Sequence, residues 1–109
     1  MPTWDDVRRI AAALPDVDDT TSYGQPCFKV NGRPFVNTGR VEGAIVTRAP
    51  DVERDLLISA RPDAYFVTPH YVGWEAVLVR LDAVDDDELA GRLEDSYAFI
   101  RAKPKRRKR

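Results

Sequence analysis

The sequence contains only one cysteine and one histidine, and this scarcity excludes several kinds of site. Cys27 has no second cysteine with which to form an internal disulfide, so the fold cannot depend on disulfide cross-links. A tetrahedral zinc site needs several thiolate or imidazole ligands, and Cys27 and His70 supply too few of them. We therefore predict no metal site.

Long apolar runs and nucleotide-binding motifs are also missing. The sequence has no apolar run long enough to span a membrane and no charged-then-apolar leader, so we expect a cytoplasmic protein without a membrane partner. It has neither the G-x-x-x-x-G-K-[ST] nor the G-x-G-x-x-G pattern, because "GRVEG" at residues 39–43 holds only two glycines and joins two predicted strands. We expect no cofactor.

Charged residues, by contrast, are numerous and unevenly distributed. Residues 1–100 carry ten Lys or Arg against 18 Asp or Glu, a net charge of −8, whereas residues 101–109 contribute +7. The hydrophobic content of 43% is sufficient for one globular domain, which we place at residues 1–102. Residues 103–109 form a basic tail without an apolar face, which favours disorder. Such a tail could also attract phosphates.

Three stretches have the apolar spacing of three and four residues that is typical of amphipathic helices. The first follows Thr3, the second begins at Pro50, and the third runs from about Asp86 to Ala102 behind a capping Asp85. Their predicted apolar faces are Trp4, Val7, Ala11 and Leu14, then Val52, Leu56, Leu57 and Ala60, and finally Leu89, Leu93, Tyr97 and Ile100.

Five short β-branched or aromatic runs predict strands, namely "CFKV", "PFVNT", "AIVTR", "AYFV" and "AVLVRL". The stretch "PDVDDTTSYGQP" at residues 15–26 is rich in turn formers and predicts a loop. The order α-β-β-β-α-β-β-α indicates an α+β fold, with an antiparallel five-stranded sheet and three helices packed on one face. Because side chains alternate along a strand, Val30 and Val79 should face the helices, and Lys29 and Arg80 the other side.

His70 lies in "FVTPHYVGW", between two predicted strands, and permits two interpretations. Histidine is a common general base, so His70 could activate Ser22 or Cys27, although no G-x-S-x-G motif or oxyanion loop accompanies it. Alternatively the stretch is a turn, in which Pro69 and Gly73 reverse the chain. We favour the turn and predict that the protein is not an enzyme.

The same turn suggests a ligand-binding groove. Aromatic side chains near exposed turns can line a shallow site for a small molecule or a peptide. The residues of this predicted groove are Tyr23, His70, Tyr71 and Trp74.

The stretches "TSYGQPCFKVNGRPF", "FVTPHYVGW" and "VLVRLDAVDDDELAGRLEDSY", in this order and at these separations, resemble the MmcQ/YjbR family of small bacterial proteins. The likeness covers about residues 5–104. It implies a CyaY-like α+β domain whose two β-hairpins act as wings in a non-enzymatic, double-wing DNA-binding domain. On this chain the wings are the Asn31-Gly32 hairpin and the hairpin around residues 70–74.

The resemblance, together with the basic residues of the sheet and tail, predicts non-specific contacts with DNA phosphates. The candidate residues are Lys29, Arg33, Arg40, Arg48, Arg80, Lys103, Lys105, Arg106, Arg107, Lys108 and Arg109. A body with a net charge of −8 repels DNA unless its positive groups cluster. The nucleic-acid hypothesis therefore depends on where the fold brings these cations.

Overall fold

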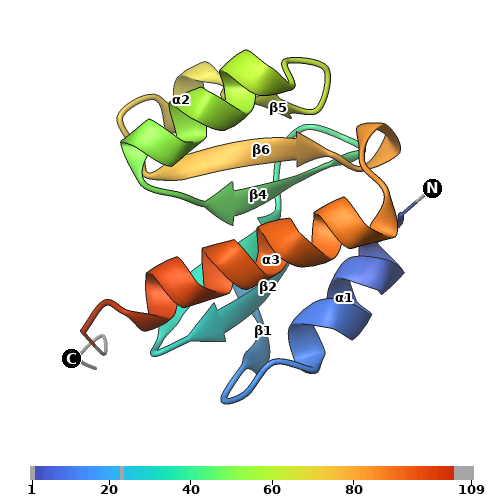
Figure 1. The fold of residues 1–109 in the computed structure, drawn as a ribbon. Helices are drawn as coiled ribbons and strands as arrows, with labels where there is room; N and C mark the ends of the chain where they lie inside the picture. Colours follow the sequence, from blue (N-terminus) through green and yellow to red (C-terminus); the bar gives the residue numbers. More distant parts are fainter. Residues whose placement is uncertain (1, 23, 105–109) are drawn as a thin grey trace.

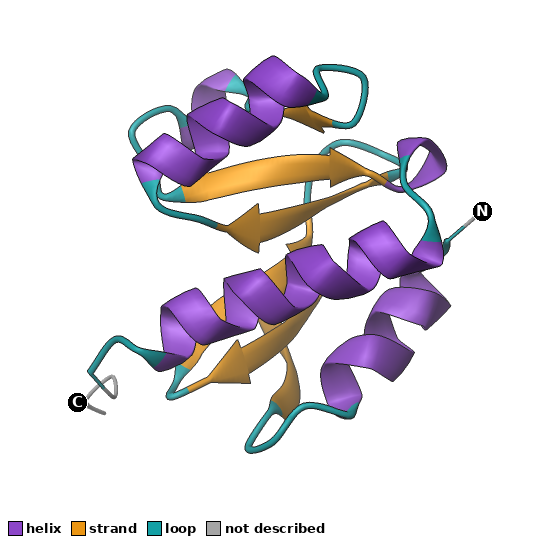
Figure 2. Cartoon of the chain, viewed as in Figure 1, coloured by secondary structure: helices purple, strands orange, loops and turns teal. Residues whose placement is uncertain are grey.

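Six strands form one antiparallel sheet, and three helices lie against it (Figures 1 and 2). The computed structural model describes residues 2–22 and 24–104. The elements are α1 (Trp4–Ala12), β1 (Asp18–Ser22), β2 (Gln25–Val30), β3 (Arg33–Thr38), β4 (Ala44–Arg48), α2 (Asp51–Ala60), β5 (Tyr65–Phe66), the 3-10 turn η1 (Pro69–Tyr71), β6 (Ala76–Arg80), the 3-10 turn η2 (Leu81–Ala83) and α3 (Asp86–Arg101).

The α+β class with three helices and an antiparallel sheet is confirmed, but the predicted number of strands is wrong. The sheet has six strands in the order β1-β2-β3-β4-β6-β5 rather than five, so the element order is α-β-β-β-β-α-β-β-α. The additional strand is β1, inside the stretch predicted to be a loop. It pairs with β2 from Asp18 opposite Lys29 to Ser22 opposite Gln25. Its sequence "DDTTS" has no apolar alternation, so side-chain periodicity does not predict a strand here. The edge strand forms because its backbone pairs with β2.

The two faces of the sheet differ as strand periodicity predicts. Val77 and Val79 of β6 belong to the main core, to which α1 contributes Val7 and α3 contributes Leu93. Leu78 lies in a second apolar cluster with Val46, Tyr71 and Ala76. This cluster covers the opposite face of β4 and β6. Val79 is fully buried and Arg80 is exposed, so the predicted orientation of β6 is confirmed.

Helix α3 begins as the sequence predicts. The Asp85 carboxylate accepts a hydrogen bond from the Glu88 N–H at 2.8 Å. Such a cap satisfies one of the free backbone donors at the start of the helix. The helix then runs diagonally across the sheet (Figure 1), and its end lies beside the turn between β2 and β3, where the Asn31 side chain donates to the Arg101 carbonyl at 2.9 Å.

The predicted apolar face of α2 is wrong except at Leu57. Val52 and Leu56 are 73% and 65% exposed, whereas Leu57 and Ile58 pack against the main core. Helix α2 lies over β6 and the two-residue strand β5 at the edge of the sheet (Figure 1). This small contact area covers only a narrow stripe of the helix, so apolar spacing alone does not identify the buried side.

The three helices of residues 2–22 and 24–104 are all too short or too polar to serve as a membrane span.

A pair of leucine substitutions tests this packing. Leu93→Ala on α3 should lower the free energy of unfolding by about 2–5 kcal/mol, because a fully buried side chain leaves a cavity. Leu56→Ala on α2 should change it by less than about 0.5 kcal/mol, since Leu56 is already exposed to solvent. Urea unfolding followed by circular dichroism measures both. Equal effects of the two substitutions would contradict the assigned core.

Candidate functional site

A cleft of about 710 Å³ lies at one end of the sheet. At this end β2 and β4 finish, β3 and β6 begin, and the C-terminal end of α3 comes close. The lining side chains are Thr21, Lys29, Arg33, Pro34, Asn37, Arg48, His70, Tyr71, Trp74, Glu75, Ala76, Phe99, Ile100 and Lys103. The cleft therefore combines strand, turn and helix residues that are far apart in the sequence.

Arg48, the last residue of β4, is held by α3 through its backbone. Its N–H donates to the Ser96 hydroxyl at 2.8 Å, and its carbonyl accepts from Arg92 Nη2 at 2.9 Å. The Ser96 hydroxyl in turn donates to the Phe35 carbonyl of β3. Buried hydrogen bonds of this kind fix the geometry of the groups that they join. The position of Arg48 is therefore determined by two polar side chains on the inner side of α3.

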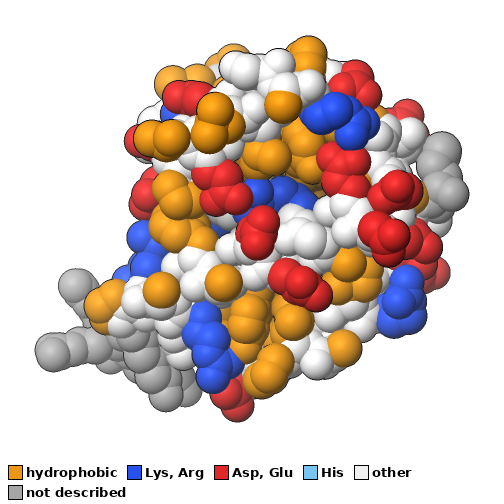
Figure 3. Space-filling view, viewed as in Figure 1, with side chains coloured by type: hydrophobic (Ala, Val, Ile, Leu, Met, Phe, Trp, Pro, Cys, Tyr) orange, Lys and Arg blue, Asp and Glu red, His pale blue; other side chains and the backbone are white. Residues whose placement is uncertain are grey.

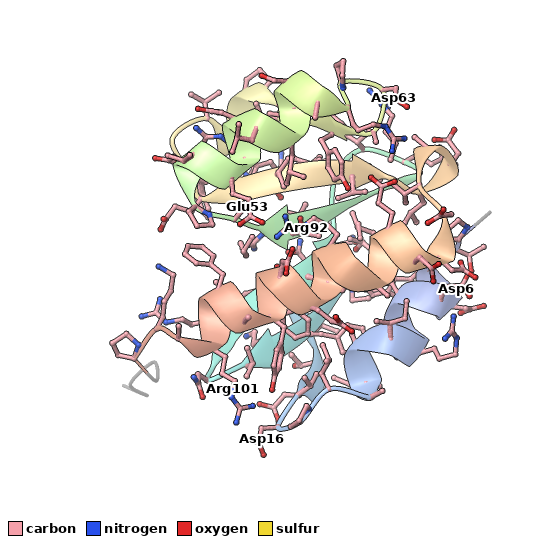
Figure 4. The ribbon with its side chains drawn as sticks, in the orientation of Figure 1. Asp6, Asp16, Glu53, Asp63, Arg92 and Arg101 are labelled. Atoms are coloured by element: carbon pink, nitrogen blue, oxygen red, sulfur yellow. The ribbon has the colours of Figure 1, made fainter. Side chains whose placement is uncertain are left out.

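Arg92 needs a counter-charge because its side chain is buried. Glu53 of α2 supplies it, with 3.2 Å between Arg92 Nη1 and Glu53 Oε1. Figure 4 shows Arg92 and Glu53 pointing toward each other from α3 and α2. Helix α2 thus contributes to the site indirectly, by neutralising the residue that binds the Arg48 backbone.

The Arg48 side chain, by contrast, has no carboxylate partner among the described residues. Its Nη2 donates to the Asn37 Oδ1 at 3.1 Å, whereas its buried Nη1 has no hydrogen-bond partner in this part of the chain. Burial lowers the pKa of the Arg48 guanidinium, because removal from water disfavours the charged form. An arginine nevertheless stays protonated at neutral pH, so the cleft contains a poorly neutralised positive charge.

The other charged residues of the cleft strengthen this positive character. Lys29, Arg33 and Lys103 line it together with Arg48, and Glu75 is the one carboxylate among the described lining residues. Glu75 pairs with Lys103 at 3.3 Å. A concave site with several cations and a single carboxylate attracts anions.

Aromatic rings form another part of the lining. Trp74 is 55% exposed and stacks with His70, with 6.2 Å between ring centroids and an interplanar angle of 25°. Tyr71 is buried and meets both rings edge-on. The cleft therefore offers a planar, accessible indole close to its cations, a combination suited to ligands with a planar ring and a negative group.

The stretch around His70 forms the turn that the sequence predicts. Residues Pro69–Tyr71 make a 3-10 turn, and Gly73 has a φ of +84°, which glycine adopts without strain. Cys27, the thiol considered as a nucleophile, is fully buried, and desolvation raises its pKa, which disfavours the reactive thiolate. In the part of the chain that the structure describes, His70 has no hydrogen bond to Cys27.

The predicted cations separate into two groups. Lys29, Arg33, Arg48 and Lys103 meet in the cleft, whereas Arg40 and Arg80 lie at the opposite end of the sheet, where Arg80 pairs with Ala44 across β4 and β6. The Arg80 guanidinium packs 4.2 Å from the centre of the Phe66 ring. Tyr23 and the predicted tail residues Lys105, Arg106, Arg107, Lys108 and Arg109 lie outside the described residues.

Sequence reasoning missed Asn37, Arg92 and Ser96. Asn37 lies on a strand with no motif around it. The two α3 residues have a weak signal, because Arg92 and Ser96 fall on the same helical stripe as Leu89, Leu93 and Ile100. A polar residue on a buried stripe must find a partner in the core. The identity of that partner, the Arg48 backbone, follows only from the fold.

The residues that the structure describes contain no group of three or more His, Cys, Asp or Glu side chains placed to hold a metal ion.

A serine substitution tests the contact between α3 and β4. Ser96→Ala should lower the free energy of unfolding by about 1–3 kcal/mol, because it leaves the buried Arg48 N–H and Phe35 carbonyl without a partner. The control Ser59→Ala, on the exposed side of α2, should stay within about 0.5 kcal/mol of the parent. Chemical denaturation measures both, and a loss for Ser59→Ala as large as that for Ser96→Ala would refute the contact.

Comparison with known proteins places this architecture in a family. The YjbR family model matches residues 12–99. The chain is 31% identical to the uncharacterised proteins Rv2570 of Mycobacterium tuberculosis and Mb2600 of Mycobacterium bovis, over 89% of this chain and 87% of each relative.

A solved structure shows the same fold. The crystal structure of Deinococcus radiodurans protein DR2400, which contains a DUF419 domain, superposes with a TM-score of 0.81 at 25% sequence identity. The similarity covers 94% of this chain and 81% of the Deinococcus chain. The resemblance noted in the sequence is therefore confirmed, and the chain belongs to the YjbR family.

Proposed function

We propose that the chain is a non-enzymatic DNA-binding domain that contacts phosphates with the positive end of its sheet. The observation that carries this proposal is the convergence of Lys29, Arg33 and Arg48 in one cleft. A DNA ligand agrees with the cytoplasmic location that we expect from the sequence.

The pattern of ion pairs supports the proposal. Of the 12 Lys and Arg among the described residues, seven have carboxylate partners within 4.0 Å, and these pairs lie mainly on and around the helices. The five without one in this part of the chain are Lys29, Arg33, Arg40, Arg48 and Arg80. Cations that are not neutralised internally are the ones available to replace the counterions of DNA, and three of these five, Lys29, Arg33 and Arg48, lie in the cleft.

The distribution of acidic residues answers the objection raised by the net charge. Asp and Glu side chains spread over α2 and α3 on the face shown in Figure 3, whereas Glu75 alone of the described lining residues brings a carboxylate to the cleft. The molecule is therefore polarised, and a DNA backbone can approach the cleft while the acidic helices stay farther away.

The two predicted wings lie at this same end of the sheet. Asn31 and Gly32 turn β2 into β3 with φ angles of 55° and 74°, and the turn of residues 67–75 leads into β6 at Ala76, which pairs with Arg48. The start of the basic tail is close by, since Arg33 Nε donates to the Pro104 carbonyl at 3.2 Å. Five consecutive basic residues follow Pro104 in the sequence. Hairpin turns, cleft and tail together would form one phosphate-binding region.

Two double alanine substitutions, one at each end of the sheet, test this proposal. The double variant Lys29→Ala/Arg33→Ala should weaken DNA binding and make the slope of log affinity against log salt less negative by about 1.8, or about 0.9 for each lost phosphate contact. The matched control is Arg40→Ala/Arg80→Ala, which removes two unpaired cations from the opposite end and should leave the slope nearly unchanged. Fluorescence anisotropy with labelled DNA at about 50 and about 200 mM salt measures both. Absence of binding by the intact chain at the lower salt would refute the proposal.

A second candidate function is small-molecule or peptide binding in the same cleft. Its volume of about 710 Å³ is within the range of about 300–1,000 Å³ that ligand pockets occupy. His70, Tyr71 and Trp74 of the predicted groove line it as well, so residues of both hypotheses meet in this cleft.

Removal of the tail separates the two candidates. A chain that ends at Pro104 lacks five basic residues, so its DNA affinity should fall and its salt slope should become less negative by at most about 4.5. A small-molecule site would not require this tail. The same anisotropy titration compares the shortened and intact chains. Equal DNA affinities would show that the tail does not contribute to DNA binding.

A further inference from the structure

The cleft itself suggests which form of nucleic acid it takes, an inference that rests on the proposed function. Proteins that read duplex DNA usually insert a protruding helix or ribbon into a groove of the DNA. In this protein the cations and the exposed aromatic ring do not protrude but line a concave site of about 710 Å³. A concave site must receive a group that projects from the ligand, and in a paired duplex the bases are stacked and do not project.

The cations of the cleft are arranged for a phosphate. The Arg48 guanidinium has one hydrogen bond from Nη2 to Asn37 and no ion pair among the described residues, and its backbone is fixed by Arg92 and Ser96. Lys29 lines the same cleft and has no ion pair in this part of the chain either. Asp18 lies opposite Lys29 in the β1–β2 register, but the two side chains form no salt bridge. A phosphate bound here would supply the missing counter-charge.

The aromatic side chains are arranged for a base. Trp74 lines the cleft, is 55% exposed and is supported by His70, which stacks with it, and by Tyr71, which meets it edge-on at 80°. Two hydrogen bonds of the Trp74 backbone hold this turn. The Trp74 N–H donates to the Tyr71 carbonyl, and the Trp74 carbonyl accepts from Arg54 Nη1, both at 3.0 Å. Exposed aromatic rings in a basic groove are the usual stacking platforms for unpaired bases.

We propose that the cleft holds one unpaired nucleotide of a single-stranded nucleic acid, with its base stacked on Trp74 and its phosphate between Arg48 and Lys29. A free nucleotide has the same chemistry, but the basic residues that follow Pro104 favour a longer strand, whose neighbouring phosphates they can contact. The base identity is not selected, because every base has a planar face that can stack.

The test compares a labelled single strand of about 12 nucleotides with the duplex of the same sequence, by fluorescence anisotropy with the full chain. The single strand should bind more tightly than the duplex. Trp74→Ala should weaken single-strand binding about tenfold or more and leave duplex binding nearly unchanged, since stacking on one ring contributes about 1–3 kcal/mol per base. Trp74→Phe, which keeps a ring, should restore part of the affinity.

Val72→Ala is the matched control, because Val72 is 70% exposed in the same turn and does not line the cleft. It should leave single-strand binding unchanged, and thermal unfolding should show that all three variants are folded. Duplex binding equal to or tighter than single-strand binding, or no effect of Trp74→Ala, would overturn the inference while leaving the proposed function intact. Thymidine monophosphate that binds as tightly as the strand would also overturn it. Failure of both strand and duplex to bind would instead refute the proposed function.

Discussion

The candidate site depends on one contact, the pair of hydrogen bonds by which α3 holds the backbone of Arg48. Ser96 accepts from the Arg48 N–H and Arg92 donates to the Arg48 carbonyl, so the inner side of α3 fixes the end of β4. The same serine donates to Phe35 of β3. One helix therefore positions two neighbouring strands at the end of the sheet where the cleft lies. Because these polar groups are buried, their geometry is rigid and their loss is costly.

This arrangement explains how the half-buried Arg48 can lack a carboxylate partner among the described residues. Taking a guanidinium out of water is unfavourable, and structural arginines such as Arg92 offset that cost with an ion pair, here to Glu53. Among the described residues, the Arg48 side chain has only the Asn37 amide as a hydrogen-bond partner, and the open cleft lies beside it. A packing role alone would favour an uncharged residue at this position. A preorganised anion site requires a charged side chain on a rigidly held backbone, and Arg48 meets both conditions.

Acidic and unpaired basic side chains are also separated across the whole molecule. The net charge of −1 suggests a nearly neutral protein, but acidic side chains spread over the helices and the unpaired cations of the described residues all belong to the sheet and its connecting turns. The fold thus creates a dipolar surface that the composition conceals. The proposed interaction with phosphates uses the end of the sheet where three of these five cations line the cleft.

Sequence periodicity by itself determined the three helices, the alternation of Val79 and Arg80, and the turn around His70, because each is set by local spacing or by residues with restricted backbone conformations. The family was recognisable for the same reason, from stretches of contiguous residues.

Strand β1 was not predictable, since its stability comes from backbone pairing with β2 rather than from its own side chains. Tertiary structure alone decided which cations meet. It brings Lys29, Arg33 and Arg48 of three strands together with Lys103, which follows α3, and it places Arg40 and Arg80 at the other end of the sheet. It also joins Arg92 and Ser96 to Arg48 across more than forty positions of the chain. Contacts at such separations depend on how helix and sheet pack, and no local pattern records them.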